Sequence, residues 1–132
     1  YDKYFLDIPG PAFDFVKWKY TNSSYFISAA SNDLIGENYD LIVITDVLEH
    51  VENPEIILNV IINALKPEGF LLYHFHDDIN KPGHLAQSIK LKPNCDQLIK
   101  NKFQFICNLK YIPQYSLWQK IAPQVSNSNV LG

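Results

Sequence analysis

The segment Tyr39–Thr45 (YDLIVIT) constrains the fold of this chain more than any other part of its sequence. It is an unbroken run of mostly aliphatic and β-branched residues, which is typical of a parallel strand buried on both faces. Parallel strands are joined by crossover connections that usually contain a helix. The segment therefore predicts an α/β fold in which helices cover a largely parallel sheet on both faces.

Helix-like and strand-like segments alternate around this strand. Pro11 and Pro54 suit the first turn of a helix, where the amide hydrogen that proline lacks would be unpaired. Apolar residues recur at helical spacing over 57–65, residues 66–69 are expected to end that helix, and the next strand is expected at 70–75. The remaining predicted elements are strands at 4–7 and 25–28, a helix at 12–20, weaker helical segments at 84–89 and 95–100, and strands at 103–111 and 115–122.

The last two predicted strands are separated only by Ile112-Pro113-Gln114. A link this short joins antiparallel strands. The 132 residues contain no internal repeat and no linker-like segment, and this length is typical of one domain. The sequence thus predicts one domain that ends in an antiparallel hairpin, followed by a flexible tail at residues 123–132.

Composition excludes several classes of partner. The chain has 14 acidic and 11 basic residues, so it lacks the positive charge that nucleic acid or an anionic membrane would attract. It has neither an apolar run of about 20 residues nor a signal peptide at its start. Cys95 and Cys107 form no Cys-x-x-Cys motif and are interpreted as buried, inert thiols. We therefore expect a cytoplasmic protein without membrane or nucleic-acid partners.

Open α/β sheets bind ligands beyond the carboxyl ends of their strands. In this sequence that rule selects Asp7 and the loops at 29–33, 45–50 and 76–84. Functional side chains are expected in these four places.

Residues 39–75 resemble the central block of the class I S-adenosylmethionine-dependent methyltransferases. That block begins a buried strand with an aromatic residue and Asp, continues with a D-x-L-E-H-V turn and an N/D-P helix start, and has L-K-P-G-G before the next strand. The matching residues here are Tyr39-Asp40, Asp46-Val47-Leu48-Glu49-His50-Val51, Asn53-Pro54 and Leu65-Lys66-Pro67-Glu68-Gly69. The resemblance implies a Rossmann-like sheet, S-adenosylmethionine as cofactor and methyl transfer to a small-molecule acceptor.

The resemblance also implies where the cofactor binds. Asp7 corresponds to the acid that accepts hydrogen bonds from the ribose hydroxyls. Residue 30 falls where many members carry an adenine-binding Asp, and the turn after residue 44 lines the reactive end of the cofactor. The cofactor-binding residues expected on this basis are Asp7, Ile8, Ala30, Ser31, Thr45, Asp46 and Val47.

The first strand of the family and its glycine-rich turn would precede Tyr1. Residues 1–132 are accordingly expected to be the C-terminal portion of one class I methyltransferase domain, whose activity needs upstream residues. A sheet that lacks its central first strand exposes inner edges, so self-association through those edges is expected.

Two histidines are candidates for a general base. A histidine titrates near neutral pH, so His50 or His84 is able to deprotonate an acceptor hydroxyl. For His50 the alternative is a structural role, in which the Glu49-His50 pair fixes its turn by hydrogen bonds. With the methyltransferase interpretation we assign no metal ligand.

Two other functions stay open. The first is a non-catalytic methyltransferase-like module that contacts other proteins. The second is a metal-dependent hydrolase, because His74 and His76 are spaced to lie on one face of a strand, with Asp78 next to them. This H-x-H-x-D spacing is similar to the opening motif of metallo-β-lactamase-type hydrolases.

Overall fold

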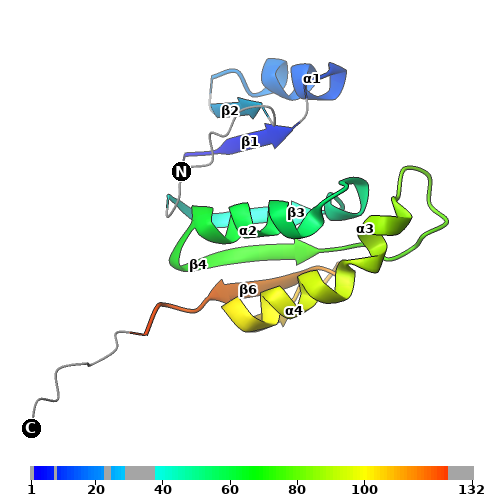
Figure 1. Ribbon diagram of the computed structural model, residues 1–132. Coiled ribbons are helices and arrows are strands. Elements are labelled where there is room, and N and C mark those ends of the chain that lie inside the picture. The colour runs from blue at the N-terminus through cyan, green and yellow to red at the C-terminus, as the bar shows by residue number, and fades with distance from the viewer. Residues whose placement is uncertain (1, 8, 23–24, 29–37, 125–132) are drawn as a thin grey trace, which may run out of the picture. The chain divides into compact units, whose positions relative to one another are not determined.

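The computed structural model describes residues 2–7, 9–22, 25–28 and 38–124, and Figure 1 shows the elements that they form. The chain divides into two units, Tyr1–Ile35 and Gly36–Gly132. In the first unit, strands β1 (Tyr4–Asp7) and β2 (Tyr25–Ser28) are parallel, and helix α1 (Pro11–Lys19) lies between them in sequence. The two strands are those that the sequence predicts.

The second unit contains the Tyr39–Thr45 strand, at the residues predicted for it. Its elements are β3 (Tyr39–Thr45), the 3-10 helix η1 (Leu48–His50), α2 (Pro54–Ala64), β4 (Leu65–His74), α3 (Ala86–Lys90), α4 (Lys92–Lys102), β5 (Phe103–Asn108) and β6 (Ser116–Lys120).

The sheet of the second unit is mixed. Its strand order is β3-β4-β6-β5, with β3 parallel to β4, and with β6 antiparallel to both β4 and β5. The predicted C-terminal hairpin is confirmed, but the sheet is not largely parallel. The chain turns back within a few residues, where the Tyr115 amide donates to the Ile112 carbonyl over 2.9 Å, so β6 has to run against β5.

β4 begins earlier than predicted, directly after α2. Residues 66–69 do not end the helix but run beside the start of β3, and Leu65 pairs with Tyr39. Glu68 has a positive φ of 63° there. Gly69 allows the close approach, because a Cβ atom at that position would lie 2.9 Å from the Lys66 carbonyl oxygen and 3.2 Å from that of Asp40.

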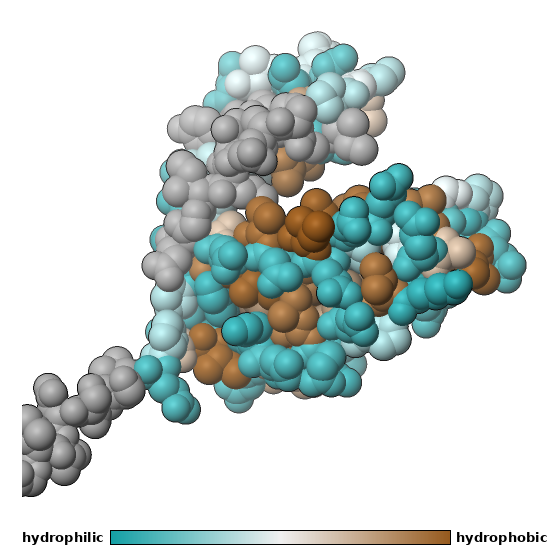
Figure 2. Space-filling view, viewed as in Figure 1, coloured by the Kyte–Doolittle hydropathy of each residue, from teal (hydrophilic) through white to brown (hydrophobic). Residues whose placement is uncertain are grey.

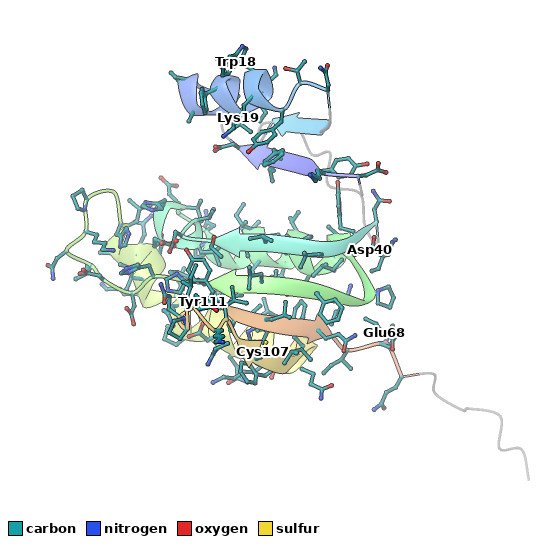
Figure 3. The ribbon with its side chains drawn as sticks, turned by 180° about the vertical axis from the view of Figure 1, so that it is seen from behind. Trp18, Lys19, Asp40, Glu68, Cys107 and Tyr111 are labelled. Atoms are coloured by element: carbon teal, nitrogen blue, oxygen red, sulfur yellow. The ribbon has the colours of Figure 1, made fainter. Side chains whose placement is uncertain are left out.

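Both long helices of this unit, α2 and α4, lie on the same face of the sheet, as opposite views show (Figures 1 and 3). In β3, Ile42 and Ile44 pack into the core, whereas the alternating residues Leu41 and Val43 are exposed. Helices on both faces are therefore not found within the described residues of this unit, because α1 belongs to the other one. The buried core residues are Ile44, Leu48, Leu58, Ile61, Ile62, Leu65, Leu71, Tyr73, Phe75, Cys95, Ile99 and Phe103.

The outer side of α2 keeps some apolar surface. Figure 2 shows hydrophobic side chains among hydrophilic ones on this side of the unit, and the exposed apolar residues of α2 are Ile56, Ile57 and Val60. β3 and β5 are the outer strands of the sheet. Self-association through sheet edges stays a prediction.

Only one of the two cysteines is buried. Burial raises the pKa of the Cys95 thiol to about 11, so this thiol stays protonated. Cys107, labelled in Figure 3, is exposed, contrary to the prediction, because it lies on the outer strand β5, where residues 104–108 are all exposed.

A lysine from the last strand holds the end of α2. Lys120 Nζ donates to the carbonyl oxygens of Ile62 and Leu65, each over 2.7 Å. Carbonyls in the last turn of a helix lack partners within the helix, so this ammonium group satisfies two of them.

None of the helices in the described residues is long and apolar enough to cross a membrane. The predicted tail at 123–132 lies mostly outside the described residues, which end at residue 124.

Candidate functional site

β3 and β4 are parallel, so their carboxyl ends lie at the same edge of the sheet. Figure 3 shows this edge on the side of the Tyr111 label, at the opposite end of the sheet from Asp40 and Glu68. A cavity of about 470 Å³ lies here, and all four histidines of the chain line it. Its wall is formed by Asp46, Glu49, His50, His74, His76, Asp77, Lys81, His84, Gln114 and Tyr115.

Asp46 is the first residue after β3 and connects three segments of the chain. Its Oδ1 atom lies 2.7 Å from His74 Nδ1 at the end of β4, and its Oδ2 atom accepts a hydrogen bond of 2.6 Å from the Tyr115 hydroxyl. The rings of His74 and Tyr115 stack with centroids 5.1 Å apart. Asp46 has a positive φ of 55°, a conformation that Asp adopts more readily than most residues.

These contacts keep Asp46 ionised. Partial burial by itself raises the pKa of its carboxyl group, but the hydrogen bonds from Tyr115 and His74 outweigh burial and lower the pKa below its ordinary value. The hydrogen bond to Asp46 in turn raises the pKa of the Tyr115 hydroxyl. At neutral pH the cavity therefore contains a carboxylate and a protonated phenol.

His50 comes from η1 and is held by the loop after β4. Its Nδ1 atom lies 2.8 Å from the carbonyl oxygen of Gly83. Gly83 has a positive φ of 84°, and a Cβ atom there would lie 3.4 Å from His50 Nδ1. The glycine thus permits both the backbone conformation and the close approach of the ring.

His84 and Glu49 lie deeper in the same wall. His84 Nδ1 is 2.6 Å from the carbonyl oxygen of Asp78, and its Nε2 atom is 4.0 Å from Glu49 Oε1. The rings of His84 and His50 meet edge to face, with centroids 4.9 Å apart. Glu49 is fully buried, and neither of its carboxylate oxygens has a hydrogen-bond partner among the described residues.

The geometry does not support the hydrolase set of His74, His76 and Asp78. His74 Nδ1 contacts Asp46, so only Nε2 of His74 is left for a metal ion. The two ring nitrogens of His76 lie 3.1 Å from the Asp78 amide and 2.9 Å from Lys81 Nζ. Within the described residues, the group of three metal-ligating side chains that converges is Glu49, His50 and His84 instead.

The structure brings together only some of the residues selected from sequence. Asp46, His50 and His84 line one cavity, and Thr45 ends β3 immediately before it. Val47 precedes η1 and is 42% exposed. Asp7 ends β1 in the first unit, next to Ser28 of β2. Ile8, Ala30 and Ser31 lie outside the described residues.

Sequence reasoning missed two features of the site, which are the contact between Tyr115 and Asp46 and the burial of Glu49 close to His50 and His84. Tyr115 directly precedes β6, and Ser116 pairs with Tyr73 near the carboxyl end of β4. The signal for the first contact was therefore the antiparallel pairing of the last strand with β4. For Glu49 the signal was its place between Leu48 and His50, in a turn that follows a buried strand.

Comparison with known families identifies the chain. Residues 7–111, most of the chain, match the family model described as Methyltransferase domain (Methyltransf_23). The chain belongs to this methyltransferase domain family. The resemblance found at residues 39–75 is thereby confirmed, whereas no curated protein sequence matches the chain.

Solved structures agree in fold. A SAM-dependent methyltransferase from Methanosarcina mazei aligns with a TM-score of 0.64 at 12% identity, over 93% of this chain and 84% of that one. A Sulfolobus solfataricus protein described as a type 11 methyltransferase aligns with a TM-score of 0.62 at 14% identity, over 93% of this chain and 72% of that one. An O-methyltransferase family protein from Burkholderia thailandensis aligns with a TM-score of 0.61 at 15% identity, over 92% of this chain and 44% of that one. At such low identity these matches establish the α/β fold alone.

Proposed function

We propose that this protein transfers the methyl group of S-adenosylmethionine to a small-molecule acceptor. The observation that carries the proposal is a cavity at the carboxyl ends of β3 and β4, lined by Asp46, in a chain of the methyltransferase domain family. The proposal treats both units as parts of one methyltransferase domain, because the family match includes residues of each.

The residues that are described suit the cofactor. S-adenosylmethionine supplies an activated methyl group on a positively charged sulfur, so the protein mainly has to orient the reactants and exclude water. Asp46 stays ionised beside the cavity, and its carboxylate favours a cationic ligand. Thr45, Asp46 and Val47 would surround the reactive end of the cofactor, and Asp7 would accept hydrogen bonds from the ribose hydroxyls.

The histidines in the wall suit an acceptor that has to lose a proton. A carbonyl oxygen only accepts hydrogen bonds, so the contacts with Gly83 and Asp78 place a hydrogen on Nδ1 of His50 and His84. Each neutral ring then keeps a lone pair on Nε2. This wall is therefore suited to taking up the proton of an acceptor hydroxyl, either on a ring or through a group that the rings bind.

Thermal unfolding with S-adenosylhomocysteine tests cofactor binding. For the protein in its full natural length, the ligand is expected to raise the melting temperature, since a ligand that binds only the folded state stabilises it. The variant Asp46→Asn is expected to show a smaller shift. Asp40→Asn is the matched control, because Asp40 lies at the opposite end of the sheet and contacts exposed Lys66. A folded protein whose melting temperature does not respond to the ligand contradicts the proposal and favours a non-catalytic module.

A further inference from the structure

The buried carboxylate of Glu49 needs a partner that the described protein atoms do not supply. Glu49 has no exposed surface, and both of its carboxylate oxygens lack hydrogen bonds within the described residues. Burying an ionised carboxylate without a partner costs several kcal/mol. Such a partner is the neighbouring His84, an ordered water molecule or a bound cation.

The two neighbouring histidines favour a bound cation as the partner of Glu49. The carbonyl oxygens of Gly83 and Asp78 hold the Nδ1 hydrogens of His50 and His84, so in the neutral form of each ring the lone pair lies on Nε2. Histidines that bind metals are usually fixed in this way, with the non-coordinating nitrogen donating to a backbone carbonyl or a carboxylate. A simple ion pair between Glu49 and His84 is a poorer explanation, because its atoms are 4.0 Å apart, beyond hydrogen-bond distance.

The three side chains also converge. One ligand atom from each of Glu49, His50 and His84 lies within 4.8 Å of the other two. Metal–ligand bonds of about 2 Å place the ligands of a tetrahedral ion roughly 3.4 Å from one another, so the ligand atoms have to approach one another by up to about 1.4 Å around an ion. His50 is exposed and Gly83 lies in a loop, so this wall has room for such a movement.

We propose that Glu49, His50 and His84 bind one divalent transition-metal ion in the wall of the cavity. Two imidazoles and one carboxylate are typical ligands of zinc and of related ions such as Co²⁺, whereas Mg²⁺ prefers an octahedron of oxygens. Three protein ligands leave a further coordination position for water or a substrate.

The role of the ion rests on the proposed methyl transfer. Asp46 and the three ligands line one cavity, so the ion would lie where the acceptor enters. An oxygen of the acceptor that binds the open position becomes more acidic and is held in place. In this arrangement the lone pairs of His50 and His84 coordinate the ion, so neither ring acts as a free base.

Cobalt binding tests the site without any methyl transfer. The full-length protein is treated with a chelator, dialysed and titrated with Co²⁺ in the absence of cofactor, while the visible absorption of the bound ion is recorded. We expect saturation at one Co²⁺ per chain and displacement by one Zn²⁺. Glu49→Gln and His50→Gln are each expected to weaken Co²⁺ binding by more than about 10-fold, because each removes a ligand.

Two control variants give the experiment its specificity. Glu52→Gln removes an exposed acid close to Glu49 in sequence, and His74→Gln removes a histidine of the same cavity that is not in the proposed set. Both are expected to keep the Co²⁺ affinity within about 3-fold, because neither removes a proposed ligand. His50 is exposed, so its variant is expected to fold even if the Glu49 variant does not.

Three results would overturn the proposal. The first is a folded protein that binds no Co²⁺ or Zn²⁺. The second is binding that survives Glu49→Gln and His50→Gln but is lost in His74→Gln, which would move the site to the other end of the cavity. The third is binding of Mg²⁺ with no binding of Co²⁺. The Co²⁺ titration does not need S-adenosylmethionine, so a protein that binds no metal ion would leave the proposed methyl transfer unaffected.

Discussion

The hydroxyl group of Tyr115 donates a 2.6 Å hydrogen bond to Oδ2 of Asp46, a residue 69 positions earlier in the chain. Asp46 follows β3, and Tyr115 precedes β6, which lies on the far side of β4. His74 at the end of β4 contacts the other oxygen of the same carboxylate. The orientation of Asp46 in the cavity therefore depends on the pairing of three strands.

Removing the hydroxyl group tests this dependence. In Tyr115→Phe the carboxylate of Asp46 loses a donor, so its pKa is expected to rise toward the ordinary value of 3.8. An NMR titration of the Asp46 carboxyl carbon measures the change. An unchanged pKa of Asp46 would show that the hydrogen bond is not formed in solution.

The same change alters the pH dependence of stability. The folded pKa of Asp46 is lower than its ordinary value of 3.8, so ionised Asp46 adds stability that is fully present above about pH 4 and is lost as the pH falls through the folded pKa. In Tyr115→Phe this acid-dependent loss is expected to be smaller. The effect is modest, because the Asp46 side chain is 45% exposed. Urea unfolding at pH 6 and at pH 3 compares the two proteins.

Lys120 is expected to matter more for stability than an exposed lysine does. Lys120→Met leaves the carbonyl oxygens of Ile62 and Leu65 without their donor, at a cost of about 1–2 kcal/mol in the free energy of unfolding. Lys66→Met, which removes only an exposed pair with Asp40, is expected to cost less than about 0.5 kcal/mol. Equal losses in urea unfolding of the two variants would contradict the role assigned to Lys120.

Gly69 is expected to tolerate no side chain. In Gly69→Ala the new Cβ atom would lie 2.9 Å from the Lys66 carbonyl oxygen, so the backbone between β3 and β4 has to shift. A loss of roughly 1–3 kcal/mol is expected, as for other overpacked sites. Gly10→Ala is the control, because nothing lies within 4 Å of its Cβ position. Thermal unfolding of both variants measures the difference.

Asp7 is expected to bind the ribose of the cofactor. Hydrogen bonds to a charged group contribute about 1.5–3 kcal/mol, so Asp7→Asn should weaken S-adenosylhomocysteine binding by roughly 10- to 100-fold. Asp14→Asn, in helix α1, is the control, because it changes the net charge of the protein by the same amount as Asp7→Asn. If both variants bind the ligand as tightly as the natural protein, Asp7 is not a cofactor residue.

Local sequence patterns predicted the elements well where one strong local signal, such as an apolar run or a proline at a helix start, determines the structure. The apolar run of Tyr39–Thr45 gives β3 at its predicted residues, and Pro54 begins α2 as expected. The pattern failed at residues 66–69. A lysine, a proline and a glycine there suggested the end of a helix, but the pairing of Leu65 with Tyr39 draws the segment into β4.

The site was harder to predict from sequence, because part of it depends on pairing between distant segments, as at residues 66–69. The choice of Asp46, His50 and His84 followed from motifs and from the rule on strand ends, and all three line the cavity. The contact between Tyr115 and Asp46 depends on long-range strand pairing. The burial of Glu49 depends on how η1 packs, and its place between Leu48 and His50 is the single local signal for that burial.

Calorimetric titration of the full-length protein with S-adenosylhomocysteine tests the central claim most directly. The account predicts saturable binding at one site per chain, weakened by Asp7→Asn and by Asp46→Asn. A protein shown to be folded by circular dichroism that releases or absorbs no heat of binding at any of several temperatures would contradict it.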